Sequence, residues 1–200
     1  MAFSDYKSIA QVQQIYKIIY KEENFITPEE ISPSAHFIEE FTFNKEYFDL
    51  YISESSRCEL IILPILREIY KPYAKKYSLW IQKSISYDDK LTGTPDYLIA
   101  TRSPLGKTVL DKPLLILVEA KKNDFEQGWG QCAAELVAAQ KLNDDVNLSV
   151  YGIVTDGRFW QFAQLIQNVF IQHNVAYSID NLPLLFGVLN SLFTSISSHN

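Results

Sequence analysis

The stretch "TPDYLIATRSPLGKTVLDKPLLILVEAKK", residues 94–122, decides the fold because it holds two apolar segments joined by a polar loop. Residues 95–102 and 113–121 are rich in apolar and β-branched residues, and Gly106 lies between them, a pattern typical of two strands. Apolar residues occupy both alternating sets of positions in 114–118, which indicates a strand covered on both faces. The sequence therefore predicts a mixed α/β protein with this strand at the centre of its sheet.

The central strand ends in charged residues. Side chains alternate faces along a strand, so Glu119 and Lys121 point the same way. If the loop near Gly106 and Lys107 closes an antiparallel hairpin, Asp96 falls opposite residues 117–119. Two converging carboxylates repel unless a cation lies between them. Mg²⁺ binds one or two protein carboxylates and leaves sites for water and phosphate oxygens. We therefore expect Asp96 and Glu119 to bind Mg²⁺ (or Mn²⁺), with Lys121 beside them.

The periodicity of the remaining chain predicts the elements around this hairpin. Apolar residues at helical spacing predict helices over 5–23, 55–76, 124–142 and 181–196, the second kinked at Pro64 and the third capped by Asn123 or Asp124. Alternating segments predict strands over 78–87, 147–155, 159–166 and 168–179, and residues 24–53 indicate irregular structure with short helical pieces. The core order is helix, three strands, helix, strand.

The chain length favours a single domain over residues 1–200. Within it we expect an N-terminal helical extension at 1–54, a core at 55–155, and a C-terminal hairpin, strand and closing helix at 156–200. The start of the chain lacks a secretory signal, and no apolar run reaches the roughly 18 to 20 residues of a membrane span. We therefore expect a cytoplasmic protein that does not associate with a membrane. Cys58 and Cys132 have neither a disulfide framework nor zinc-ligand spacing, so we expect reduced thiols.

Charge is unevenly distributed along the chain. The net charge is −6, but residues 67–122 hold 11 Lys and Arg against 6 Asp and Glu. This basic surplus around the quoted stretch is compatible with a nucleic-acid partner, because clustered Lys and Arg bind phosphates. A lysine-rich, solvated helix end at Lys71, Lys75 and Lys76 explains the surplus equally well, and both interpretations stay open.

These residues together resemble the PD-(D/E)XK nuclease superfamily, whose fold is the restriction-endonuclease-like one. Pro95-Asp96 resembles its "PD", and Glu119-Ala120-Lys121 resembles its "(D/E)XK", on the second and third strands of an αβββαβ core. The resemblance covers roughly residues 55–155. It is closest to the nuclease domain at the start of type I restriction enzyme R subunits and to related small stand-alone proteins, which share a "GxPDY … VEAKK … Q" pattern and a later hairpin similar to "VTDGRFW".

The resemblance implies roles for several residues. Asp96 and Glu119 would bind Mg²⁺ with the Ala120 carbonyl as third ligand, and Lys121 would position or activate the attacking water. An acidic residue on the preceding helix would join them; Glu59 is our candidate and Glu54 the alternative.

Further residues are expected at the periphery of this site. Gln131 matches a glutamine that many family members carry on the following helix. The tyrosine expected four residues later is replaced by Glu135, so this motif is half matched. Four basic residues are candidates for contact with the nucleic-acid backbone, which positions a substrate without specifying its sequence: Lys83, Lys90, Arg102 and Lys122.

The function expected from the resemblance is metal-assisted hydrolysis of DNA phosphodiester bonds, in which the ion polarises the phosphate and lowers the pKa of a bound water. One alternative is a catalytically inactive nuclease-fold module for binding or assembly, suggested by the acidic body and the half-matched glutamine motif. Another is an RNA substrate. A homodimer and a protein partner are further expected associations, with residues 24–53 as the candidate interface.

Overall fold

The computed structural model describes residues 2–122 and 124–198, and its centre is an 8-stranded mixed sheet. Its strands run in the order β1-β9-β8-β7-β6-β5-β2, with β10 paired to β8. Their bounds are β1 (Ile19–Glu22), β2 (Tyr77–Ile81), β5 (Tyr97–Arg102), β6 (Leu110–Ala120), β7 (Val150–Thr155), β8 (Phe159–Ile166), β9 (Val169–Gln172) and β10 (Tyr177–Ser178). A separate small hairpin joins β3 (Ile85–Ser86) to β4 (Thr92–Gly93).

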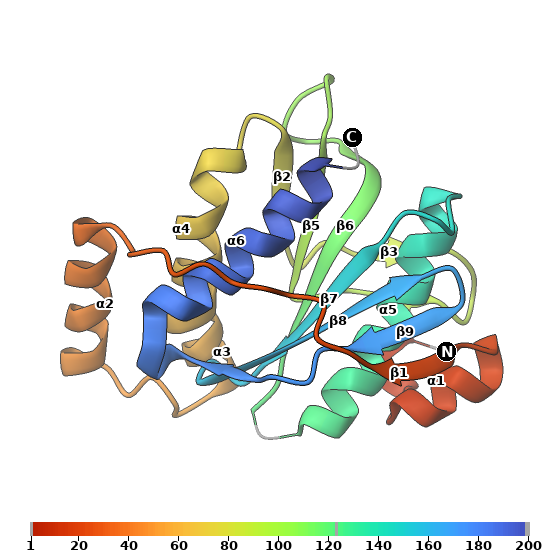
Figure 1. Ribbon diagram of the computed structural model, residues 1–200, viewed down its shortest axis with the longest axis horizontal. Helices are drawn as coiled ribbons and strands as arrows, with labels where there is room; N and C mark the ends of the chain where they lie inside the picture. The colour runs from red at the N-terminus through yellow and green to blue at the C-terminus, as the bar shows by residue number, and fades with distance from the viewer. Residues whose placement is uncertain (1, 123, 199–200) are drawn as a thin grey trace.

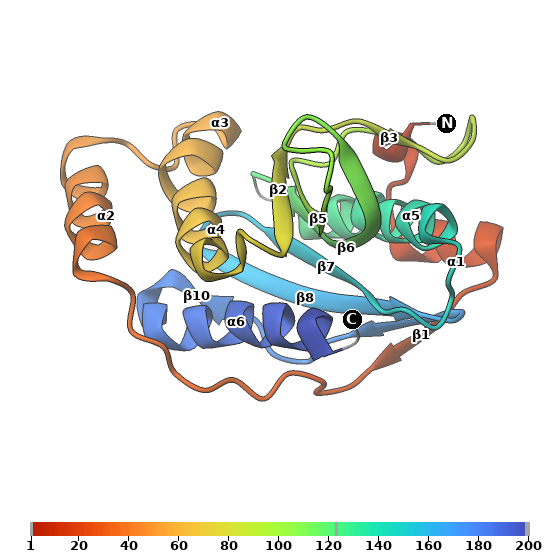
Figure 2. The same cartoon turned by 90° about the horizontal axis from the view of Figure 1, so that it is seen from above.

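Helices cover both faces of this sheet. They are α1 (Ile9–Tyr16), α2 (Ala35–Tyr47), α3 (Glu54–Arg57), α4 (Leu63–Tyr70), α5 (Phe125–Asn143) and α6 (Leu182–Ser198). Figures 1 and 2 show α4 and α6 over one face and α1 and α5 over the other. Each face has its own apolar core, one built with residues of α4 and α6 and one with residues of α5. The protein is therefore a layered mixed α/β structure, as predicted.

The predicted central hairpin is confirmed, and so is its register. Strands β5 and β6 are antiparallel with Tyr97 opposite Val118 and Ile99 opposite Ile116. Helix α5 then returns the chain to β7, which runs parallel to β6. Asp124 accepts a hydrogen bond from the Gln127 N–H as the helix N-cap, whereas Asn123 lies outside the described residues. The order helix, three strands, helix, strand is thus observed.

The N-terminal prediction of one helix over 5–23 is wrong. The helix ends at Tyr16, and Lys17 takes a left-handed conformation with φ of 58°. Residues Ile19–Glu22 then form the edge strand β1, parallel to β9, where Tyr20 stacks on Phe170. β-branched and aromatic residues pack well on a sheet, and this tertiary contact outweighs a weak helical period. The expected helical extension therefore contributes a strand to the main sheet.

Other predicted elements differ from the structure as well. The strand expected over 78–87 is divided into β2 and β3, and the strand expected over 168–179 is divided into β9 and β10. Residues 24–53, expected to be mostly irregular, contain the 13-residue helix α2. The helix expected over 55–76 is divided into α3, a π-helical turn at Cys58–Ile62, and α4. Pro64 has no N–H to donate to the Leu60 carbonyl, and Asn44 Nδ2 donates to that carbonyl instead at 3.3 Å. The proline therefore restarts the helix, as the kink prediction anticipated, but through a π turn.

Helix α6 corrects the expectation that no segment is apolar and long enough to span a membrane. Among the described residues, Ile179–Ser197 meets that criterion with a mean hydropathy of 1.3. One face of this helix packs on the sheet through buried side chains such as Leu185, Leu189 and Phe193. The core helix of a folded domain has this same composition, which accounts for the hydropathy.

An extended segment at residues 24–34, which we name the strap, crosses the outside of α6 (Figure 1). The Phe25 N–H donates to His173 Nδ1 at 3.3 Å, and the Ile31 N–H donates to the Pro183 carbonyl at 2.9 Å. A Cβ placed on Gly187 of α6 would overlap the Glu29 carbonyl oxygen. The strap therefore depends on the missing side chain at Gly187 for its approach to the helix.

We predict that Gly187→Ala destabilises the protein. A Gly to Ala change inside an exposed helix normally stabilises by about 1 kcal/mol, but overlap with the strap backbone should instead cost roughly 1–3 kcal/mol. Urea denaturation would measure the loss, and limited proteolysis would locate cleavage in residues 24–34. Thr194→Ala, at an exposed position of the same helix, is the matched control. Unchanged or increased stability of Gly187→Ala would contradict the close packing of the strap.

Candidate active site

The structure brings Asp96, Glu119 and Lys121 together at one edge of the sheet. Asp96 directly precedes β5, and Glu119 lies in the last two residues of β6. The Ala120 N–H donates to Asp96 Oδ2 at 2.8 Å, and Lys121 Nζ lies 2.6 Å from Glu119 Oε1. The hairpin register thus places the two carboxylates and the ammonium in one cluster, which we name the Asp96 cluster.

The backbone around the cluster holds it in place. The Lys121 N–H donates to the Thr155 carbonyl at 2.9 Å, and the Gln82 N–H donates to the Asp96 carbonyl at the same distance. A Cβ on Gly128 of α5 would lie 3.0 Å from Lys121 Cγ and 2.7 Å from Val154 Cγ1. Because residue 128 is glycine, the first turns of α5 can pack directly against the Lys121 side chain.

Burial dominates the electrostatics of the cluster. Glu119 is only 2% exposed, and its desolvation, together with the nearby Asp96 carboxylate, raises its pKa to about 7. Burial also raises the pKa of Asp96. Burial alone would lower the pKa of Lys121, but the adjacent Glu119 carboxylate outweighs it and raises that pKa. Burial of these charged groups is therefore energetically unfavourable, and a bound cation would offset part of that cost.

A fourth acidic side chain, Glu135, reaches the cluster from the middle of α5. Its side chain is fully buried and forms a hydrogen bond with the Glu119 side chain. Gln131, one turn earlier, donates from Nε2 to Glu135 Oε1 at 3.3 Å. The described contacts of Gln131 are thus with Glu135 rather than with Asp96. From the sequence we identified Glu135 only as a mismatch to the motif. An acidic residue among the alanines of a buried helix could have indicated a role at the site.

The two acidic candidates on the preceding helix are placed differently from our expectation. Glu54 and Glu59 are both exposed and line a hollow of about 180 Å³ beside Asp96. Glu54 acts electrostatically on both Asp96 and Lys121, whereas Glu59 lies in the π turn and also lines a second hollow between α2 and α4. Glu54, our alternative, therefore acts on more of the cluster than Glu59 does, and both stay candidates because both line the hollow beside Asp96.

The basic residues do not gather around the cluster as one group. Lys83 follows Gln82 directly and packs over Trp80, and Lys122 follows Lys121, so both lie near this edge. Arg102 lies at the opposite end of β5 from Asp96 and donates to the Ala74 carbonyl. Lys90 lies in the turn between β3 and β4. These four residues are near one another in the chain, but the antiparallel strands place them in different parts of the structure.

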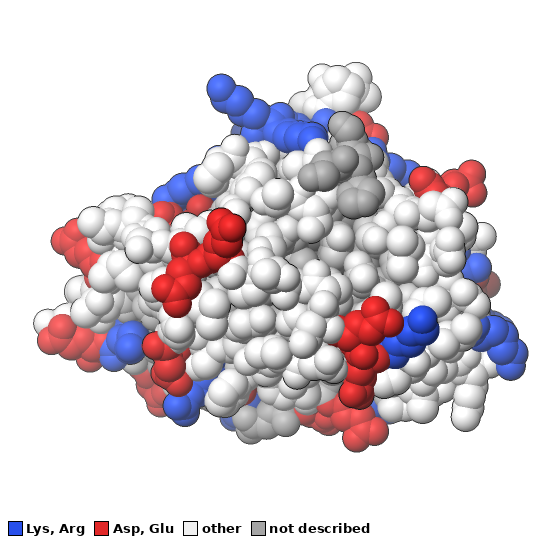
Figure 3. Space-filling view, viewed as in Figure 1, with Lys and Arg blue, Asp and Glu red and all other residues white. Residues whose placement is uncertain are grey.

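Many of the remaining cations lie at the far end of the molecule. Lys76 Nζ donates to the Ser197 carbonyl at the end of α6, and Figure 3 shows Lys and Arg side chains gathered at this end, with mixed charges along the opposite edge. The solvated helix end at Lys71, Lys75 and Lys76 thus accounts for part of the basic surplus.

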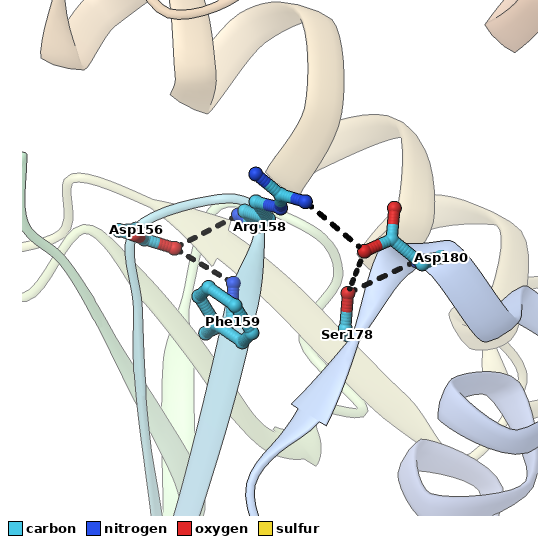
Figure 4. Close-up of polar contacts among 5 residues, drawn as sticks. All are labelled: Asp156, Arg158, Phe159, Ser178 and Asp180. Atoms are coloured by element: carbon cyan, nitrogen blue, oxygen red, sulfur yellow. Dashed lines mark hydrogen bonds and ion pairs between the residues drawn. The ribbon is translucent and has the colours of Figure 1, made fainter.

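The turn between β7 and β8 forms the neighbouring part of the edge (Figure 4). Asp156 Oδ1 accepts hydrogen bonds from the backbone N–H groups of Arg158 and Phe159, and Arg158 Nη2 pairs with Asp180 Oδ2 at 3.4 Å. The buried Arg57 donates from Nη1 to the carbonyls of Lys122, at 2.7 Å, and Asp156, at 3.0 Å. One guanidinium therefore ties the loop after β6 to the turn after β7.

The oxygen atoms at the cluster have the chemistry that Mg²⁺ requires. As the side chains stand, the described residues contain no group of three or more His, Cys, Asp and Glu that could hold a metal ion. Mg²⁺ uses only one or two protein carboxylates, however, and completes its shell with carbonyl and water oxygens. Glu119 Oε2 is buried and has no hydrogen-bond partner among the described residues. Asp96, Glu119 and the Ala120 carbonyl therefore fit such an ion.

Other hollows are less suited to this chemistry. One of them, about 600 Å³, lies between the strap and α6 and is lined by none of the cluster residues. Cys58 and Cys132 are both free.

Comparison with known proteins does not assign a family. No protein-family model matches the sequence, and no curated protein matches it. The chemistry of the edge therefore has to be judged from its own residues.

We predict that the buried acids make the metal-free protein less stable as pH rises. Because the folded pKa of Glu119 is about 7 and its unfolded value 4.5, the folded state keeps a proton that the unfolded chain has lost. The resulting stabilisation is fully present below pH 4.5 and is lost as pH rises through about 7. It amounts to at most about 3 kcal/mol. Thermal melts in chelator across this range would measure it.

The control for this prediction is the double variant Glu119→Gln with Glu135→Gln, which removes both titrating carboxyls but keeps their shapes. Other groups, such as His173, whose pKa burial lowers, contribute pH dependence of the opposite sign. Subtracting the melting curve of the variant from that of the wild type isolates the two acids. Identical pH profiles for both proteins would show that these carboxyls do not titrate in this window.

Proposed function

We propose that the protein is a metal-dependent nuclease of the PD-(D/E)XK type that hydrolyses phosphodiester bonds in DNA. The observation that carries this proposal is the Asp96 cluster: two carboxylates and an ammonium held at the end of a central strand, next to an open hollow. A protein does not bury such charges for stability alone, because desolvation exceeds the gain from pairing them. Perturbed acids beside a cleft are instead typical of a catalytic site.

The residues of the cluster suit distinct roles. Asp96, Glu119 and the Ala120 carbonyl would hold Mg²⁺ or Mn²⁺, which when bound would supply positive charge to a phosphate and lower the pKa of a water. Lys121 keeps its proton, since Glu119 raises its pKa, so its ammonium can stabilise negative charge on a phosphate oxygen. Glu54 stands across the hollow and can orient a water.

A non-catalytic binding module is the second candidate function, and one observation favours it. Lys121 already pairs with Glu119, and the nearby Asp156, Asp180 and Glu54 make the edge poor in free positive charge. Action on RNA, a homodimer, a protein partner and a cytoplasmic location stay predictions.

We predict that Asp96→Asn abolishes divalent-metal binding and lowers DNA cleavage at least about 100-fold, because it removes the charge of one ligand while keeping its shape. Calorimetric titration with Mn²⁺ and nicking of a supercoiled plasmid would be followed on the same samples. Asp88→Asn, in the exposed loop between β3 and β4, is the matched control. Metal binding without nicking of DNA or RNA would favour the binding module, and absence of binding in the wild type would refute the nuclease.

We also predict that Lys83→Ala and Lys122→Ala weaken DNA binding, whereas Lys107→Ala, in the loop at the far end of β5 and β6, does not. Loss of one phosphate contact should reduce the slope of log affinity against log salt by about 1. Fluorescence anisotropy in Ca²⁺ at several salt concentrations would measure it. An equal effect of all three substitutions would show that binding depends on overall charge instead of on this edge.

A further inference from the structure

Glu135 lies in the most enclosed part of α5. Its side chain has no exposed surface, and residues 128–140 of the helix are all buried. Cys132, Ala134 and Leu136 around it are apolar and fully buried as well. A carboxyl group in such surroundings strongly destabilises a fold unless other groups compensate it.

The described contacts of Glu135 compensate it only in part. Gln131 donates to Oε1, and the Glu119 side chain shares a hydrogen bond with it, while Oε2 has no partner among the described residues. Lys121 forms its ion pair with Glu119 Oε1 and not with Glu135. Among the described residues Glu135 thus forms no ion pair, and its polar contacts are with Gln131 and Glu119.

The Glu119 carboxyl group lies between a side chain at the end of its own strand β6 and a side chain of helix α5. Lys121 holds its carboxyl group from the strand side, and Glu135 holds it from the helix side. Gln131 in turn restrains Glu135 from the preceding turn of the same helix. A glutamate side chain has three rotatable bonds, so a single ion pair would leave its orientation poorly fixed, whereas contacts on both sides define it.

We infer that Glu135 is a positioning residue, which holds the Glu119 carboxyl group from α5 in the orientation that lets it bind a divalent cation together with Asp96. This inference rests on the proposed function and deepens it. It explains why an isolated acid occupies an apolar helix: an aliphatic side chain of similar size would pack better there but would leave Glu119 unrestrained. The buried carboxyl group of Glu135 thus lowers the stability of the fold but fixes the orientation of Glu119, the metal ligand.

Two substitutions separate this role from a purely structural one. Glu135→Leu removes the buried carboxyl and should raise the melting temperature by several degrees, while weakening Mn²⁺ binding at least about tenfold. Glu135→Gln keeps a side chain that can donate to the Glu119 carboxylate, so Mn²⁺ affinity should stay within about threefold of the wild type. Calorimetric titration with Mn²⁺ and differential scanning calorimetry of the metal-free proteins provide the two measurements.

The matched control is Gln140→Leu, which replaces another buried polar residue of α5. Its Nε2 donates to the Val146 carbonyl, near the end of the helix away from the cluster. This substitution should change the melting temperature without changing Mn²⁺ affinity. It therefore tests whether any new leucine in α5 disturbs the metal site.

Each outcome decides the inference. Stronger folding with weaker binding in Glu135→Leu, and retained binding in Glu135→Gln, would support it. Unchanged Mn²⁺ affinity in Glu135→Leu would overturn the positioning role and leave the proposed nuclease intact. A lower melting temperature or failure to fold in Glu135→Leu would show that Glu135 is structural. A wild type that binds no Mn²⁺ would overturn both the inference and the proposed function.

Discussion

The burial of Glu119 at the end of β6 is the constraint on which the rest of the edge depends. A carboxyl group with 2% exposure would be tolerated only if its surroundings supply hydrogen bonds or opposite charge. Lys121 supplies the charge at 2.6 Å and Glu135 supplies a hydrogen bond, whereas Asp96, directly before β5, adds a second carboxylate. The strand could end in apolar residues at lower energetic cost, so the stability of the fold alone does not account for the cluster.

The surrounding fold is arranged to keep this edge rigid. Gly128 allows α5 to approach Lys121, and Arg57 joins the loop after β6 to the turn after β7 through two backbone carbonyls. The first contact packs against the Lys121 side chain and the second holds two backbone carbonyls, so together they restrain the Asp96 cluster. A site built at the ends of adjacent central strands, braced by a helix on each face, meets the requirement that ligands be held precisely.

The elements near the hairpin could be predicted from sequence because their signals are local. The period-2 pattern and one glycine-containing loop predict the pairing of β5 with β6, and the register at Tyr97 and Val118 brings Asp96 to Glu119. The two register shifts nearer the loop could not be predicted. Strand β1 could not be predicted in this way, because residues 19–22 are strand only through pairing with β9, some 150 positions later. The relative placement of Glu59 and Glu54 could not be predicted for a similar reason, since the sequence shows a proline but not the π turn that accommodates it.

Glu135 illustrates a different limit of sequence reasoning. A motif comparison treats it as the loss of an expected tyrosine, whereas the structure shows a carboxyl group that contacts the central glutamate of the cluster. The spacing of four residues between Gln131 and Glu135 was visible in the sequence, but the packing of this helix face against Glu119 was not. Glu135 thus contacts the cluster with atoms other than those that the motif led us to expect. A second carboxyl group beside Glu119 shares the same desolvated space, so its negative charge adds to the repulsion there. A bound cation would therefore stabilise this edge more than it would with a tyrosine hydroxyl at the same position.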